Sequence, residues 1–510
     1  MSRRSTGCQR WLRAVMSAVL LSAVLALMAI PAAGASAGAR PWDFDGDGWR
    51  DSAVGVRGEN DGAGGIVVFR GAATGLSTSD VKRLSQASRG VPGVAEPGDG
   101  FGAALASGDF DADGYADLAV GAPGEDTSTD LNVGAVAVLY GGADGLSGTG
   151  AHSLGRPDAV LGERDPEEDE LGSQLIAADF DGDGYGDLAV AVTSGSNGLL
   201  IYRGRAAGMA TQPSQAVGPR YGLPDDLGSP PLTSLAVGDL DGNGTPDLAI
   251  GLQEVDQARG AVAVVYSAAG SGLDLQGADA PAPQVWTEDS PGVKGVAADL
   301  DAFGSAVGIT DVGGDGRKDL IVTVLQQPTS RSGVTGALHV LRGGPHGVNA
   351  LGDQYLTYEA LVNEPVGALG VALGVGDLNG DGIGDVAVTH GVHDASRNGG
   401  VVVVYGNASG LGTKGSRSFT QATTGIGGTR SSVVDYWGIT LRVRNVGKSR
   451  HADLLVSDPY EPVGGTPSGM FTVLWGSDTG VSGSRSKAVS QDTPGVPGAA
   501  EKDDLFGGAL

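Results

Sequence analysis

The chain has 510 residues, of which 90 are glycine and only 5% are aromatic, and its formal net charge is −27. Such a charge excludes a nucleic-acid-binding protein, because a polyanion is bound by a basic surface. The hydrophobic content of 40% suffices for a packed fold. The regular order in which the glycines recur argues against a low-complexity chain.

Residues 1–37 have the pattern of a secretory signal peptide. Basic residues from Arg3 to Arg13 precede an apolar run from Val15 to Ile30, and Ala35-Ser36-Ala37 is a small-residue cleavage motif. That run is short for a membrane span, and no later stretch is long and apolar enough to be one. We therefore expect a secreted, extracellular protein. The single cysteine, Cys8, would leave with the signal peptide, so metal would have to replace disulfide cross-links.

A nine-residue motif organises the rest of the chain. In Asp43-Phe-Asp-Gly-Asp-Gly-Trp-Arg-Asp51, carboxylates stand at positions 1, 3, 5 and 9 and glycines at positions 4 and 6. Oxygen ligands on alternate residues around a sharp turn are similar to the start of an EF-hand loop. A ligand set without His or Cys favours Ca²⁺ over Zn²⁺ or Cu²⁺. Asp and Gly also form ordinary turns, but the regular recurrence of the motif favours a metal site.

The motif marks seven repeats of 60 to 72 residues, whose loops begin at residues 43, 109, 179, 239, 311, 377 and 445. Two loops are degraded. Asp311–Asp319 lacks the carboxylate at position 3, and Asn445–Asp453 keeps only the one at position 9. The other five loops are intact, so we expect about five structural Ca²⁺ ions.

Each repeat also contains short segments typical of strands. In the second repeat, Phe101–Leu105 precedes the loop, Leu118–Gly121 follows it, and Gly134–Tyr140 comes next, before a more polar fourth segment. Four antiparallel strands repeated radially predict an all-β fold, a seven-bladed β-propeller over residues 41–510. A linear solenoid is the alternative, but it would need polar caps at both ends.

The first repeat lacks the Phe-Gly, Leu-Gly or Trp-Gly segment that precedes most of the other loops. It begins at Pro41-Trp42, directly before its loop, whereas Phe506–Leu510 at the end of the chain closely repeats Phe101–Leu105. We therefore expect the C-terminal strand to pair with Ser52–Val56 in the first blade. This pairing would close the ring and leave no open edge.

Phe101-Gly102, the loop Asp109–Asp117 and the run Leu118-Ala-Val-Gly-Ala-Pro123 together resemble the FG-GAP repeat of the seven-bladed propeller in integrin α-chains. Only the second repeat has a complete Gly-Ala-Pro. The resemblance implies Ca²⁺ held by aspartate and asparagine oxygens and by one main-chain carbonyl per loop. The implied side-chain ligands are Asp43, Asp45, Asp47, Asp51, Asp109, Asp111, Asp113, Asp117, Asp179, Asp181, Asp183, Asp187, Asp239, Asp241, Asn243, Asp247, Asp377, Asn379, Asp381 and Asp385, and the implied carbonyls are those of Trp49, Tyr115, Tyr185, Thr245 and Ile383.

The resemblance favours an extracellular binding or adhesion module with a protein or glycan partner, and we expect a monomer. Connections on the face opposite the calcium loops vary in length and charge, which suits recognition. They are Arg57–Gly64, Gly124–Asn132, Gly155–Glu170, Pro213–Gly228 and Thr389–Gly399. FG-GAP repeats also occur in glycosylphosphatidylinositol-specific phospholipase D, and calcium-bearing propellers occur among polysaccharide lyases. The alternatives are therefore an extracellular hydrolase or lyase, or a lectin-like glycan binder.

We assign no catalytic residues and expect a binding protein rather than an enzyme. His390 and His393 with Asp394 form the one arrangement to test as a second metal site or a base, but two loop histidines without a third ligand are more often structural. The acidic run from Glu163 to Glu170 is interpreted as a solvated charge run.

Overall fold

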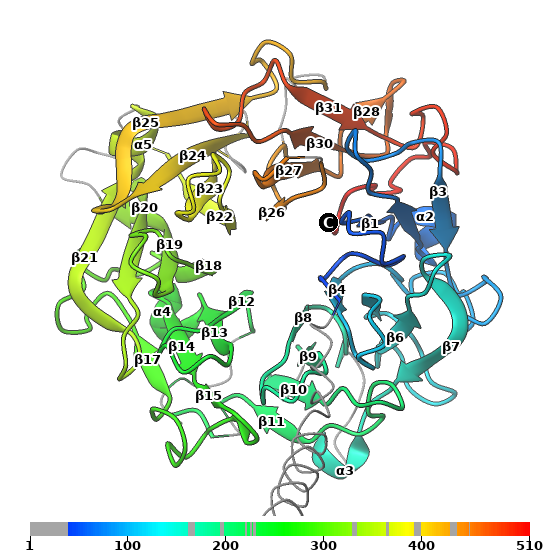
Figure 1. Cartoon of the computed structure of the whole chain (residues 1–510), viewed down its shortest axis with the longest axis horizontal. Helices are drawn as coiled ribbons and strands as arrows, with labels where there is room; N and C mark the ends of the chain where they lie inside the picture. Colours follow the sequence, from blue (N-terminus) through cyan, green and yellow to red (C-terminus); the bar gives the residue numbers. More distant parts are fainter. Residues whose placement is uncertain are drawn as a thin grey trace, which may run out of the picture.

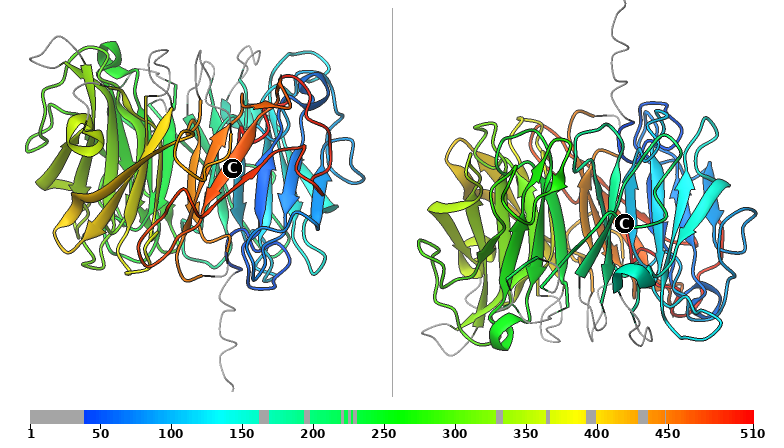
Figure 2. Two further views of the ribbon diagram at one scale, coloured as in Figure 1. Left: turned by 90° about the horizontal axis from the view of Figure 1, so that it is seen from above. Right: turned by 90° about the horizontal axis from the view of Figure 1, so that it is seen from below.

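The computed structural model describes residues 39–161, 169–193, 198–219, 222–224, 227, 231–328, 334–363, 367–391, 399–428, 436–447 and 449–510. These residues form seven antiparallel sheets of three or four strands arranged as a ring, seen down its axis in Figure 1 and from the side in Figure 2. The predicted all-β, seven-bladed propeller is therefore confirmed. The predicted signal peptide lies outside the described residues.

Six blades contain four strands each, and each blade is named here by its repeat. Blade two has β4 (Leu105–Gly108), β5 (Asp117–Ala122), β6 (Ala135–Tyr140) and β7 (Ser147–Leu154); blade three has β8 (Leu175–Ala178), β9 (Asp187–Val192), β10 (Gly198–Tyr202) and β11 (Gln215–Val217); blade four has β12 (Ser234–Gly238), β13 (Asp247–Leu252), β14 (Ala261–Val265) and β17 (Gln284–Trp286); blade five has β18 (Phe303–Thr310), β19 (Asp319–Pro328), β20 (Val334–Arg342) and β21 (Asn349–Thr357); blade six has β22 (Leu369–Gly376), β23 (Asp385–His390), β24 (Gly400–Asn407) and β25 (Gly410–Thr420); blade seven has β26 (Leu441–Arg444), β27 (Asp453–Asp458), β30 (Met470–Leu474) and β31 (Ser486–Val489).

Smaller elements lie in the connections between these strands. Two ribbons pair β15 (Ser267–Ala268) with β16 (Gly272–Leu273) and β28 (Pro462–Val463) with β29 (Thr466–Pro467). The described helices are single turns, namely α2 (Glu59–Gly62), α3 (Asp158–Leu161), α4 (Val255–Ala258) and α5 (Tyr358–Val362). No helix among the described residues has the length and apolar character needed to cross a membrane.

The second strands of the blades are deeply buried. All six residues of β5 are buried, and the same is true of β9, β13 and β23. A strand covered on both faces by neighbouring blades carries a continuous apolar run rather than an alternating one. The outer strand β7, by contrast, is mostly partly or fully exposed, as the polar fourth segments predict.

The Phe-Gly pairs join neighbouring blades. Phe101 forms a parallel bridge with Gly64 of blade one, and β4 begins only at Leu105. Gly102 has a φ of 94°, which an extended strand does not allow. Our expectation of one strand over Phe101–Leu105 is therefore wrong in its first residues. In the same way Leu171 bridges Gly134 and Phe303 bridges Gly260.

Blade one is completed by the C-terminal end of the chain, as expected. Its own strands are β1 (Ser52–Gly55), β2 (Ile66–Phe69) and β3 (Val81–Leu84). Val56 forms an antiparallel bridge with Phe506, and the Gly55 amide donates to the Ala509 carbonyl over 2.9 Å. Phe506 and Leu510 are 0% and 1% exposed, and the C-terminus lies beside β1 in Figure 1.

The metal-motif loops, which we call loops one to seven by repeat, connect each inner strand to the second strand. The connections from the second to the third strand leave from the opposite ends of the strands, and hence from the opposite face. Two of the long connections are shorter than predicted. Pro213–Gly228 contains β11, and Thr389 and His390 are the last residues of β23.

Candidate metal centres

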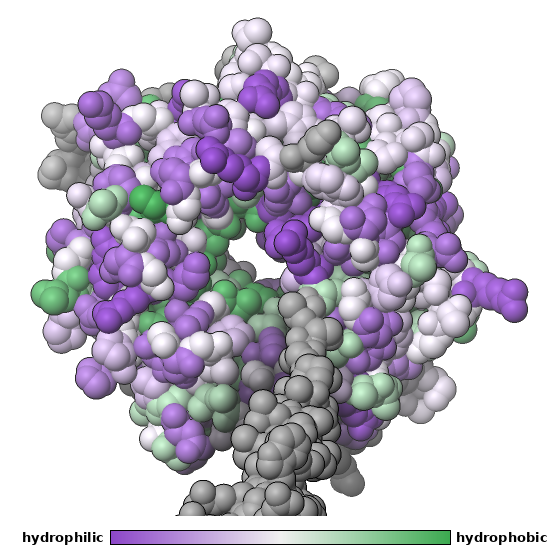
Figure 3. All heavy atoms as spheres, viewed as in Figure 1, coloured by the Kyte–Doolittle hydropathy of each residue, from purple (hydrophilic) through white to green (hydrophobic). Residues whose placement is uncertain are grey.

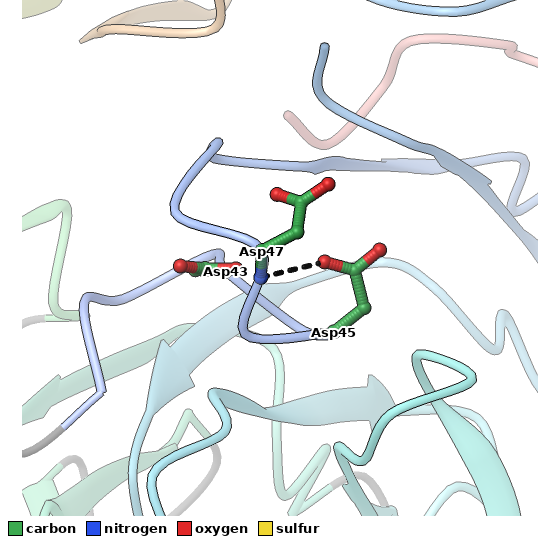
Figure 4. A group of neighbouring side chains, drawn as sticks. All are labelled: Asp43, Asp45 and Asp47. Atoms are coloured by element: carbon green, nitrogen blue, oxygen red, sulfur yellow. Dashed lines mark hydrogen bonds between the residues drawn. The ribbon is translucent and has the colours of Figure 1, made fainter.

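Acidic side chains gather in four of the five loops predicted to be intact. Figure 4 shows Asp43, Asp45 and Asp47 on the tight turn of loop one. Within each group, one ligand atom per residue lies within 4.8 Å of the others. The groups are Asp43, Asp45 and Asp47; Asp109, Asp111 and Asp117; Asp179, Asp181 and Asp187; and Asp239, Asp241 and Asp247.

Hydrogen bonds within each loop fix this arrangement. In loop three, Gly184 donates its amide to Asp179 over 2.9 Å, Asp183 donates to Asp181 over 3.3 Å, and Tyr185 donates to Asp183 over 3.0 Å. Gly184 has a φ of 93°, so only glycine fits this turn without strain. The equivalent bonds recur in loops one, two, four and six. The motif spacing thus directs the first, third and fifth side chains toward one turn.

The aspartate at position 9 has a second role that the sequence did not reveal. In loop two, Asp117 accepts the Phe110 amide over 2.7 Å and the Gly141 amide over 2.9 Å. It thereby ties the start of the loop to the end of the third strand. Equivalent pairs of bonds are made by Asp51, Asp187, Asp247, Asp385 and Asp453. The only sequence signal for this role is that position 9 is acidic in all seven repeats.

Burial makes these carboxylates costly to ionise. It raises the pKa of Asp117 to about 8 and the pKa values of Asp51, Asp187, Asp247 and Asp385 to about 7. Nearby aspartates of the same loop act in the same direction. A divalent cation in the loop would favour the ionised forms and offset this cost.

The donor set fits a hard divalent cation. Asp43 Oδ1 and Asp109 Oδ1 are buried and have no hydrogen-bond partner. Buried carboxylate oxygens without a partner are unfavourable, and a bound cation would satisfy them. Because the groups offer only oxygen, Ca²⁺ fits them better than Zn²⁺ or Cu²⁺.

The structure gathers each predicted ligand set only in part. The group in loop one omits Asp51, whereas the groups in loops two to four contain position 9 and omit position 5. Loop six, which has Asn379 at position 3, is not among the four acidic groups. The metal-ligand roles of all the predicted residues stay predictions. Those not gathered in these groups are Asp51, Asp113, Asp183, Asn243, Asp377, Asn379, Asp381 and Asp385, together with the carbonyls of Trp49, Tyr115, Tyr185, Thr245 and Ile383.

Arginines at the end of the third strand are part of these sites, and the sequence interpretation missed them. Arg70 forms ion pairs with Asp45 and, over 3.7 Å, with Asp47. Arg203 pairs with Asp181 and, over 3.1 Å, with Asp187. The signal was an arginine directly before the glycine that follows the third strand. Blades two, four and six have a tyrosine there, namely Tyr140, Tyr266 and Tyr405.

The two degraded loops keep their shape with other contacts. In loop five, Asp311 accepts amides from Gly314 over 2.6 Å and Gly316 over 2.7 Å. Arg342 pairs with Asp319 over 2.9 Å, as Arg203 does with Asp187 in loop three. In loop seven, Asn445 accepts the Gly447 amide over 3.1 Å.

The other predicted candidates do not form a second site among the described residues. His390 is buried in β23, and its Nε2 lies 2.8 Å from Ser418 Oγ, so its assignment to a surface loop was wrong. His393, Asp394 and the acidic run from Glu163 to Glu168 lie outside the described residues. Asp169 is buried and pairs with Arg156 over 2.6 Å, so this residue is not solvated as predicted, whereas Glu170 is exposed.

Comparison with known proteins identifies FG-GAP repeats in this chain. An FG-GAP repeat model matches residues 101–139, and an FG-GAP-like repeat model matches residues 179–250. Rat integrin alpha-7 is 35% identical over 179 residues, which are 34% of this chain and 14% of the integrin. Integrin alpha-PS2 of Drosophila melanogaster is 30% identical over 234 residues, which are 42% of this chain and 15% of the integrin.

Two further proteins are similar. Human phosphatidylinositol-glycan-specific phospholipase D is 30% identical over 178 residues, which are 33% of this chain and 20% of the phospholipase. The chain thus spans only a small part of the relatives it matches. A solved structure from Bacteroides uniformis ATCC 8492, provisionally described as a 6-phosphogluconolactonase, aligns with a TM-score of 0.41 and 12% identity over 86% of this chain and 99% of its own. That likeness is too slight to bear on function.

Proposed function

We propose that this chain, an FG-GAP repeat protein with a seven-bladed β-propeller and integrin α homologues, is a secreted binding module stabilised by Ca²⁺. The observation that carries the calcium proposal is the pair of buried, unpartnered oxygens, Asp43 Oδ1 and Asp109 Oδ1, within groups of three carboxylates. The ions would neutralise the loops and stabilise the ring. In this proposal they take no part in chemistry.

The face opposite loops one to seven is the proposed partner surface. Seven large apolar side chains are exposed among the described residues, and six of them lie on connections at that face. They are Val94, Leu131, Val160, Val296, Leu300 and Tyr460. Because exposed apolar side chains concentrated on one face are typical of interaction surfaces, we infer that a protein or glycan partner binds there.

A cavity of about 460 Å³ on the same face lies between blades one and two. Its lining includes Arg57, Asn132 and Glu170, which come from three different connections. Such convergent polar groups beside exposed apolar ones supply both orientation and contact area. This cavity is the proposed centre of recognition.

Metal analysis tests the calcium proposal. After dialysis against saturating Ca²⁺ and removal of free ion, we expect about five Ca²⁺ per chain, one for each intact loop. Fewer than three would contradict the proposal. A parallel dialysis against EDTA should leave none and should lower the melting temperature, because an ion that binds only the folded state stabilises it.

Protein and glycan arrays probed with the purified chain test the binding proposal. A Leu131→Ser substitution should weaken binding to any partner that the array identifies, since Leu131 is 59% exposed on the proposed surface. Leu351→Ser is the matched control, because Leu351 is 86% exposed but lies on the outer strand β21. Equal losses in the two variants would contradict the assignment of the partner face.

The similarity to the phospholipase supports a second candidate, an extracellular lipid-active or polysaccharide-active enzyme. It would be favoured if the purified chain hydrolysed a phosphatidylinositol-glycan substrate or cleaved a polysaccharide. We expect no turnover, because His390 is buried and hydrogen-bonded to Ser418 and is therefore not accessible to act as a general base. Turnover at a rate above the uncatalysed reaction would overturn the binding-module proposal.

A further inference from the structure

Two arginines give one side of the central channel a positive charge. The half of this channel nearest loops one to seven has a volume of about 320 Å³ and is lined by the inner strands of blades two to seven and by Trp42 of blade one. Only two of its lining residues are charged, Arg442 and Arg444, and both belong to β26. Figure 3 shows the face hollowed at the centre of the ring.

The residue directly before the metal-motif loop has a large side chain only in blades one and seven, which meet where the ring closes. In blades two to six that residue is small, namely Gly108, Ala178, Gly238, Thr310 and Gly376. In blades one and seven it is Trp42 and Arg444. The Arg444 Cζ lies 3.9 Å from the centroid of the Trp42 ring. The two large side chains thus stack on each other where the first and last blades meet.

Arg444 is buried, and two of its three guanidinium nitrogens have no hydrogen-bond partner. It is 6% exposed, and its Nη2 donates to Ser52 Oγ over 2.7 Å. Its Nε and Nη1 are buried and have no hydrogen-bond partner. Leaving buried donors of a cation unpaired is unfavourable, and the cation–π contact with Trp42 offers no acceptor in their place.

Two more arginines strengthen the positive potential. Arg442 is two residues earlier on the same strand face and lines both halves of the channel. Burial lowers the pKa of Arg444 to about 9, and the charges of Arg442 and Arg50 act in the same direction. None of the three forms an ion pair with a carboxylate of the described residues. The nearby Asp51 already accepts two backbone amides.

We propose that the channel binds a small oxyanion between Arg442 and Arg444, at the end nearest loops one to seven. Sulfate, phosphate and a carboxylate share the chemistry that this site requires, which is a negative charge with several acceptor oxygens. Such an anion would accept from the free Nε and Nη1 of Arg444 and reduce its repulsion with Arg442.

Calorimetric titration with sulfate tests the proposal, with phosphate and acetate as further titrants and chloride used to hold the ionic strength constant. We expect one sulfate per chain. Arg444→Gln should weaken binding by about tenfold or more, because charge-assisted hydrogen bonds are lost. Arg89→Gln is the control, since Arg89 is exposed on the connection that follows β3. The tightest of the three titrants identifies the kind of anion.

Arg442→Gln provides a second variant in case Arg444→Gln alters folding, because Arg442 is solvent-accessible within the channel. We expect it to weaken sulfate binding while leaving the melting temperature without anion unchanged. All titrations are repeated on protein that has been stripped of Ca²⁺ with EDTA and then dialysed free of EDTA, where binding should persist. The proposal is overturned if none of the three anions binds, if binding is equal in Arg444→Gln and Arg89→Gln, or if it is lost with Ca²⁺.

Discussion

Loop three (179–187) and loop seven (445–453) have the same place in their blades but differ in acidity. Loop three gathers three carboxylates within 4.8 Å, whereas loop seven has only Asp453. Yet Asp187 and Asp453 accept equivalent pairs of backbone amides, over 3.0 to 3.1 Å in loop three and 2.9 to 3.0 Å in loop seven. The motif thus has two separate roles. The position 9 aspartate fixes the loop through backbone hydrogen bonds in both loops, whereas a group of carboxylates that could bind an ion is present only in loop three.

The largest predicted effect concerns the joint between blade one and blade seven, whose loop keeps only the carboxylate of Asp453. Deleting residues 503–510 removes Phe506 and Leu510, which are 0% and 1% exposed, and each should cost about 3 kcal/mol of unfolding free energy. We expect aggregation or a much lower denaturant midpoint. A truncated chain that keeps its melting temperature and calcium stoichiometry would show that the C-terminal strand does not hold the ring.

The next largest loss of stability should come from substituting the position 9 aspartate in loop three or loop seven. Asp187→Asn and Asp453→Asn each leave one buried backbone amide facing an NH₂ group, so we expect a loss of about 2 to 3 kcal/mol in EDTA for both. Urea unfolding measures this. If only Asp187→Asn were destabilising without metal, the shared structural role of position 9 would be wrong.

Substituting the aspartate at position 3 should affect ion binding without affecting the structural role of position 9. Asp181→Ala should abolish the ion of loop three, at a cost of about 1.4 kcal/mol when free Ca²⁺ is tenfold above the dissociation constant. In EDTA the same substitution should cost much less. Asp315→Ala in loop five is the control, because that loop already lacks its position 3 carboxylate. Equal losses of calcium-dependent stability in the two variants would mean that loop five also holds an ion.

The contribution of loop seven to the unfolding free energy should depend on pH through Asp453. Burial raises the pKa of Asp453 from 3.8 to about 6. A raised pKa in the folded state means that this group favours folding at low pH, fully below pH 3.8, and that its contribution is lost as the pH rises through about 6. The difference in unfolding free energy between wild type and Asp453→Asn should therefore shrink between pH 4 and 7. A constant difference would contradict the raised pKa.

The smallest predicted effect concerns the arginine that pairs with loop three. Arg203→Ala should tighten calcium binding there by roughly threefold, because a positive charge that competes for Asp181 and Asp187 is removed. Titration of the variant against wild type measures the change. Weaker binding would instead indicate that Arg203 orients the carboxylates for the ion.

The sequence predicted the features that depend on residues close together in the chain or on segments that repeat along it. The spacing of Asp43–Asp51 sets its own turn, and the likeness of Phe506–Leu510 to Phe101–Leu105 revealed the closing strand. Each of these depends on residues that are adjacent in the chain or repeated along it. The predictions of blade number and ring closure therefore needed no knowledge of distant contacts.

Features that depend on packing between distant segments were missed. Arg203 pairs with aspartates 16 and 22 residues earlier, across a turn between two strands. Phe101 pairs with Gly64 of another blade, which its position next to β4 did not suggest. The stacking of Arg444 on Trp42 joins the two ends of the chain. In each case the partner is chosen by the closed ring rather than by the local pattern.

Backbone hydrogen bonds also link successive loops. The Ala116 amide donates to the Asp43 carbonyl over 2.9 Å, and the Gly186 amide donates to the Asp109 carbonyl over 2.7 Å. An ion that orders loop one would therefore preorganise loop two, and loop two would preorganise loop three. Loop six has only the degraded loops five and seven as neighbours. Calcium should accordingly fill the first three sites cooperatively, with a Hill coefficient above one, and should fill the sixth as an independent site.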